Sequence, residues 1–279
     1  MSGLRVLRRD RATAAAIVTV ALLVAGAVAV PYAVRTAYDV QDLSQTLQGP
    51  SAEHWFGTDQ FGRDLLTRLA YGGRISFAIS GTAVLAHTAI GTTGGMLAGF
   101  LGGTADSVLM RVTDVFLAFP PILFLILITG VLGPSLLNII IALSLVGWAG
   151  MARQVRAEAL ALRGQEFIDA ARALGATDRR IVVRHVLINV LTVALVRASL
   201  DVGPVILSEA TLSFLGIGIQ PPMPSWGVMI AEGLPRLRSE PYLALIPSVV
   251  LSLAILALTF AGEGIAEALD PRARRRQAR

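Results

Sequence analysis

Long apolar runs separated by short polar stretches dominate the sequence. Six runs are long enough for a helix to cross a bilayer, whose hydrocarbon core of about 30 Å takes about 20 residues. They lie at about 13–34, 75–101, 112–132, 134–152, 187–208 and 242–262. Because backbone polar groups cannot stay unpaired in hydrocarbon, each run is expected to be a helix. The pattern therefore predicts an all-α, polytopic membrane protein with about six transmembrane helices.

The polar stretches are too short and scattered to form a second globular core. We therefore expect one transmembrane domain over residues 1–279: residues 1–74 hold the first span and an external segment, and residues 75–270 form the core, with a long polar loop at about 153–189. A cleaved secretory signal is the alternative for the first span. Its apolar run is longer than the 7 to 15 residues of a typical signal core, which favours a retained span.

Composition agrees with a membrane setting and excludes several chemistries. Hydrophobic residues make up 54% of the chain and charged residues 15%, whereas soluble proteins carry about 25% charged residues. With no cysteine, disulfides and thiolate nucleophiles are excluded. All 24 basic residues are arginine, so the lysine of a phosphate-binding P-loop is missing. We therefore expect no enzyme activity and no ATP hydrolysis in this chain.

Arginine placement predicts the orientation of the spans. With the amino terminus inside, 17 arginines fall in cytoplasmic segments and six in external ones, while Arg197 lies within a span. Positive charge concentrates on the cytoplasmic side of membrane proteins, so both termini are expected in the cytoplasm. The bias also accounts for the sequence pI of about 10.6 without a nucleic-acid partner.

The polar loop at about 153–189 has the pattern of two helices joined at a glycine. Four apolar residues recur at helical spacing and predict an amphipathic helix with an apolar stripe: Leu160, Phe167, Ala171 and Leu174. Gly175 is expected to end this helix, and Thr177 to cap a second one that runs through Ile181 and His185 into the fifth span. Such a segment either presents a surface to a partner outside the membrane or lies in the lipid interface.

The residues of this loop carry a family resemblance. DAARALGATDRRIVVRHVLIN, at 169–189, resembles the EAA loop of ATP-binding cassette import permeases, which docks into a cleft on the ATPase subunit. The resemblance implies ATPase-coupling roles for Asp169, Ala170, Ala171, Gly175, Ile181, His185 and Asn189. There are two departures: Asp169 replaces the usual glutamate, and Ile188 stands where proline is common, which implies a less kinked entry into the fifth span.

Three further stretches extend the resemblance over roughly residue 50 to the end. The segments at 54–77, 98–124 and 209–230 are similar to those of the C-type permease of dipeptide, oligopeptide and nickel importers. The resemblance implies a plasma-membrane importer of di- or oligopeptides, with nickel or another small solute as the alternative cargo. It also implies a second permease subunit, two ATP-binding subunits that hold ATP and magnesium, and an extracellular or periplasmic solute-binding protein.

Charged residues inside spans are candidate functional groups by default. Arg197 and Asp201 are four residues apart, so they can form an ion pair on one helix face or line a translocation pathway. A secondary transporter driven by an ion gradient is the alternative class, because it would need ionisable residues near the membrane centre. Only this pair offers such residues.

Other polar residues predict structure. Spacing favours the pairs Asp64–Arg68, on a short external helix, and Arg111–Asp114. Glu209 and Glu263 lie near span ends, where water is expected to reach them. Glycines at 91, 95 and 99 predict a bare helix face that packs closely on a neighbour. His54, His87 and His185 are too far apart in sequence to indicate a metal site.

Overall fold

The computed structural model describes residues 11–34 and 37–269, and every regular element in these ranges is a helix. The elements are α2 (Arg11–Val34), η1 (Leu43–Gln45), α3 (Leu65–Leu101), α4 (Gly103–Ala118), α5 (Pro121–Leu132), α6 (Leu136–Arg163), α7 (Glu166–Ala173), α8 (Asp178–Ile181), η2 (Val182–Val186), α9 (Leu187–Phe214), α10 (Trp226–Gly233), η3 (Leu234–Arg236) and α11 (Tyr242–Leu269). Five described helices are long and apolar enough to cross a membrane, or six spans if a bent pair counts as one. The predicted all-α membrane fold is confirmed.

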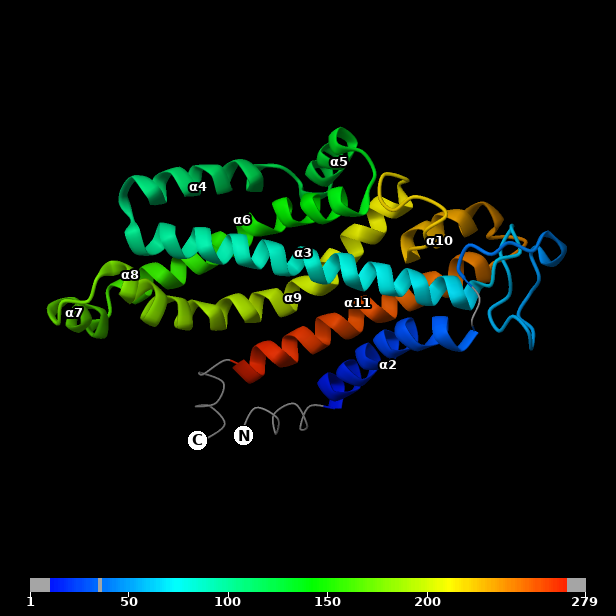
Figure 1. Cartoon of the computed structure of the whole chain (residues 1–279), viewed down its shortest axis with the longest axis horizontal. Helices are drawn as coiled ribbons and strands as arrows, with labels where there is room; N and C mark the ends of the chain where they lie inside the picture. The colour runs from blue at the N-terminus through cyan, green and yellow to red at the C-terminus, as the bar shows by residue number, and fades with distance from the viewer. Residues whose placement is uncertain (1–10, 35–36, 270–279) are drawn as a thin grey trace.

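The long helices lie side by side along the longest axis of the molecule (Figure 1). Helices α3, α6 and α9 pack on one another, while α2 packs against α3 and α11. The short helices α7 and α8 lie at one end of the bundle, and α10 and the segment 37–64 lie at the other (Figure 1). The two polar regions of the chain are thus a full span apart.

The α3–α6 contact is close because α3 lacks side chains where the two backbones meet. A Cβ at Gly99 would lie 2.5 Å from the carbonyl oxygen of Arg156, and one at Gly91 would lie 2.6 Å from Cβ of Met151. A Cβ at Gly95 would collide with the backbone of Ala152. The predicted packing role of these glycines is confirmed.

The third predicted span, 112–132, is wrong as one straight helix. The chain there forms α4 and α5, which are bent by 94° at a short break. Helix α4 ends at Ala118, Pro120 precedes α5, and Pro121 is its first residue. Consecutive prolines lack the N–H groups that would continue α4, whereas proline fits the first position of a new helix. The apolar run hid this break because both halves are hydrophobic.

The second span begins earlier than predicted and absorbs the expected external helix. Helix α3 starts at Leu65, capped by Asp64, whose Oδ1 accepts from the Thr67 N–H at 2.7 Å. The other carboxylate oxygen of Asp64 lies 2.9 Å from Nδ1 of His54. The expected Asp64–Arg68 pair is therefore wrong, because the cap and the histidine occupy both oxygens of Asp64.

Candidate functional site

The predicted helix–glycine–helix corner is present at the α7 end of the bundle. Gly175 has a φ of +83°, and it follows α7 in the left-handed conformation that glycine adopts without strain. The N–H groups of Gly175 and Ala176 donate to the carbonyl oxygens of Arg172 at 2.9 Å and Ala171 at 3.0 Å, which is a Schellman motif. Thr177 then caps α8 by accepting from the Arg180 N–H. Both predicted boundary residues are confirmed.

A buried apolar cluster packs the corner against the long helices of the bundle. Ile168 of α7 and Ile181 of α8 are fully buried and pack with residues of α3, α6 and α9. Ala171 is half-buried against the same cluster. Ile181, one of the residues implied in ATPase coupling, therefore holds the corner in place and presents no surface of its own.

Three residues of the predicted apolar stripe are exposed at this end of the bundle. Leu160, Phe167 and Leu174 are exposed, and Leu174 has 89% of its surface accessible. The prediction of one continuous amphipathic helix is wrong, because α6 ends at Arg163 and a separate helix, α7, starts at Glu166. Among the predicted coupling residues, Asp169, Ala170, Gly175 and Asn189 are exposed, and His185 is half-buried. The corner thus has two adjacent exposed residues, Leu174 and Gly175, that a partner could contact.

Ion pairs fix the elements around the corner. The guanidinium of Arg172 lies 3.6 Å from Asp169 and 3.8 Å from Asp178, so it joins α7 to α8. On α6, Arg156 pairs with Asp106 of α4, and Arg153 lies 2.6 Å from Asp114. The expected Arg111–Asp114 pair is therefore wrong, because Asp114 turns toward α6. These contacts hold α4 against α6 independently of α5.

The entry into the fifth span is continuous. Helices α8 and α9 run on through the π-helical turn η2, so that Asp178–Phe214 counts as a single span of 37 residues. The side-chain amide of Asn189 donates to the carbonyl oxygen of His185 at 2.7 Å. Unbroken helix therefore connects the start of α8 to the end of α9.

A polar cluster lies within the bundle, where α3 and α9 meet. The predicted Arg197–Asp201 pair is confirmed at 2.9 Å, and His87 Nε2 of α3 lies 3.3 Å from the same carboxyl group. His87 is 1% exposed, and a Cβ on Gly147 of α6 would collide with its ring. The side chain of Arg197 is 44% exposed, so this guanidinium stands on the surface of the isolated chain.

A groove is present on the surface of the helix bundle. It has a volume of about 460 Å³ and lies between α6, α9 and α11. Its lining comprises Gln154, Thr192, Val193, Val196, Ala266, Glu267 and Leu269. Three of these residues are polar, while apolar atoms make up most of the lining.

Glu209 is more deeply buried than predicted. It is fully inaccessible, whereas Glu263 is exposed as expected. The two carboxyl oxygens of Glu209 accept hydrogen bonds from the hydroxyls of Ser76 at 2.7 Å and Ser213 at 2.9 Å. The prediction that water reaches Glu209 is wrong, because these serines from α3 and α9 replace water around it. Periodicity could not reveal Ser76, which lies 133 residues from Glu209 along the chain.

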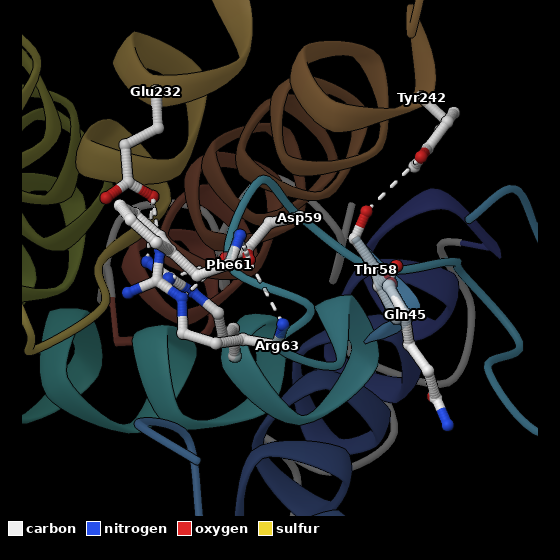
Figure 2. Close-up of polar contacts among 8 residues, drawn as sticks. Gln45, Thr58, Asp59, Phe61, Arg63, Glu232 and Tyr242 are labelled. Atoms are coloured by element: carbon white, nitrogen blue, oxygen red, sulfur yellow. Dashed lines mark hydrogen bonds and ion pairs between the residues drawn. The ribbon is translucent and has the colours of Figure 1, made fainter. Parts of the chain in front are cut away.

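A second polar cluster lies at the opposite end of the bundle, and Figure 2 shows Asp59, Arg63 and Glu232 within it. Asp59 lies 2.6 Å from Arg63 and 2.8 Å from Arg68, and Glu232 of α10 lies 2.8 Å from Arg68. Both guanidinium groups are at most 3% exposed. Burial raises the pKa of Glu232, with Asp59 acting in the same direction, while Arg63 opposes the shift. The cluster joins the segment 37–64 to α3 and α10.

Together these features define a polytopic membrane protein with a rigid corner at one end and a closed polar cluster at the other. A family model described as "binding-protein-dependent transport system inner membrane component" matches residues 91–275. The chain belongs to this family of membrane transport permeases.

Curated relatives cover most of the chain. It is 40% identical to the dipeptide transport system permease protein DppC of Alkalihalophilus pseudofirmus, over 95% of this chain and 88% of that protein. It is 37% identical to the oligopeptide transport system permease protein OppC of Haemophilus influenzae, over 95% and 86%. It is 39% identical to the glutathione transport system permease protein GsiD of Pectobacterium atrosepticum, over 87% and 79%.

A solved structure supports the fold. The chain is similar to a chain of the inward-facing MetNI methionine ABC transporter, with a TM-score of 0.59 and 20% sequence identity, covering 73% of this chain and 96% of that one. At this identity the likeness concerns the fold alone.

Proposed function

We propose that this chain is a permease subunit of an ATP-binding cassette importer that moves di- or oligopeptides into the cytoplasm. In this proposal the α7 end faces the cytoplasm, where both termini also lie, and the α10 end faces outward. The partners are a second permease, two ATPase subunits that bind ATP and magnesium, and a solute-binding protein. The dipeptide and oligopeptide relatives support the cargo class.

The observation that carries the mechanism is the corner at Gly175. It is rigid, because a Schellman motif and a fully buried pair of isoleucines support it, and it still exposes Leu174. A rigid exposed corner suits a partner that pushes and pulls on it. ATPase closure would move the corner, and the continuous helix behind it would shift the bundle between two access states. The ATPase interactions must differ between these states to drive the change.

Reconstitution tests this function. Liposomes holding this chain, the second permease and both ATPase subunits, with the solute-binding protein and labelled dipeptide outside, should accumulate the peptide only when ATP is inside. Omitting the ATPases should abolish uptake. Accumulation driven by a proton or sodium gradient without ATPases would instead establish a secondary transporter. Competition by nickel chelates would test the alternative cargo.

Arg197 is expected to line the pathway in this assembly. A charged side chain on a lipid-facing span is costly, so its 44% exposure favours contact with water or the second permease. We expect Arg197→Ala to lower the initial uptake rate about tenfold, which corresponds to about 1.4 kcal/mol. Leu195→Ala is the matched control, because Leu195 is 54% exposed on the same helix and about 200° around it. Equal rates for both variants would contradict the assignment.

A further inference from the structure

The segment 37–64 is more elaborate than a connection between two spans requires. Its turn at residues 51–57 closes on itself, because the N–H groups of Ser51 and Gly57 donate to the His54 carbonyl oxygen at 2.8 and 2.9 Å. The His54 ring points inward, with Nδ1 2.9 Å from Asp64 and Nε2 2.5 Å from the side-chain oxygen of Gln45. Ordering these residues costs conformational entropy, and the hydrogen bonds around His54 offset that cost and hold the turn in one shape.

This turn displays an apolar anchor beside a negative charge. Trp55 is 70% exposed, and Glu53 is also exposed. Because His54 between them is fixed inward, both neighbours are held outward. An exposed tryptophan on a fixed backbone is typical of the residues that dominate protein–protein binding energy, since the backbone loses little entropy when the side chain is covered.

Charge indicates which kind of surface covers the turn. Asp39, Asp42 and Glu53 are exposed, whereas the only arginine between residues 37 and 64, Arg63, is 3% exposed. Three exposed carboxylates without an exposed arginine would be repelled by anionic lipid headgroups. They favour a protein partner with a basic surface.

The segment is also connected to the helices that must move. Its Asp59 binds Arg68 of α3, which binds Glu232 of α10. The Tyr242 hydroxyl of α11 lies 3.2 Å from the carbonyl oxygen of Thr58 (Figure 2), to which it donates, and 3.1 Å from that of Gln48. A partner that docks on the turn would therefore contact a body that joins the outer ends of three helices.

We propose that the turn at residues 51–57, with Trp55 and Glu53 at its tip, is the docking surface for the solute-binding protein. The partner presents basic side chains around an apolar pocket that receives Trp55. This inference rests on the proposed function, which supplies the partner, and it adds the site of contact and its chemistry.

The test uses the assembled transporter in nanodiscs and the purified solute-binding protein of its transport system. Trp55→Ala should weaken binding at least tenfold and reduce the stimulation of ATP hydrolysis in proportion, while basal hydrolysis is unchanged. Glu53→Arg should weaken binding strongly at low salt and less at high salt, because an ionic contact is screened. Tyr32→Ala is the matched control, since Tyr32 is an equally exposed aromatic residue, at 72%, on α2.

The outcomes separate this inference from the proposed function. If the unaltered transporter binds the solute-binding protein and both turn variants bind with the same Kd, the docking surface is wrong and the proposed function stands. The same holds if Tyr32→Ala weakens binding as much as Trp55→Ala. If the unaltered transporter neither binds nor responds to the solute-binding protein, the proposed function fails and the docking surface fails with it.

Discussion

Replacing Gly175 with arginine is expected to abolish ATP-driven peptide uptake while the protein still inserts into the membrane. Nothing lies within 4 Å of a Cβ placed at Gly175, so the fold has room for a side chain. The φ of +83° adds a strain of about 1–2 kcal/mol for a residue other than glycine or asparagine. A long cation beside the exposed Leu174 would block a partner's close approach. Uptake into liposomes and co-purification of the ATPase subunits both measure the effect.

Two control variants separate surface blockage from backbone strain. Gly164→Arg adds the same side chain at another exposed glycine with open space around it and an ordinary φ of −90°, so uptake should stay within about twofold. Gly175→Asn retains the left-handed backbone, which asparagine tolerates, and should keep most of the activity. Normal transport by Gly175→Arg would show that the corner does not couple to the motor subunits.

Hydrophobic patterning predicted most of the spans because lipid imposes one requirement on every spanning segment: a long apolar helix with its backbone fully paired. It placed the ends less well. Helices α3 and α6 extend beyond the apolar runs, at Leu65 and Arg163, because protein contacts and ion pairs replace lipid there. The two prolines indicate a break at Pro120. The 94° angle of the bend depends on how α5 packs, which the local sequence does not reveal.

In the candidate sites, contacts between residues close in sequence were predicted and contacts between distant segments were not. The caps at Gly175 and Thr177 and the Arg197–Asp201 pair depend on residues within one or two turns, so spacing predicted them. Contacts between distant segments were missed: Arg68 and Glu232 are 164 residues apart. The break between α6 and α7 was also missed, because the residues from Leu160 to Leu174 follow one helical period that the structure interrupts after Arg163.

Arg68→Met is expected to be among the most destabilising substitutions in the chain. Arg68 is 1% exposed and lies 2.8 Å from both Asp59 and Glu232, whereas Arg63 lies 3.5 Å from Glu232. Methionine keeps the apolar length of the side chain and removes its charge. Removing one partner from a buried ion-pair cluster costs about 3–5 kcal/mol, because the remaining charges stay desolvated. Thermal unfolding of the purified protein in detergent, followed by circular dichroism, should show a markedly lower Tm.

Two comparisons test whether the loss of stability is specific to the ion-pair cluster. Arg74→Met removes a half-buried guanidinium that reaches one carbonyl oxygen, that of Val28 at 3.1 Å, and should lower the Tm far less. Glu232→Gln combined with Arg68→Met should cost less than the sum of the single changes, because the second change removes a carboxylate that the first left short of a partner. Additive losses, or equal losses in the two arginine variants, would mean that the cluster at the α10 end does not stabilise the fold as an ion-pair unit.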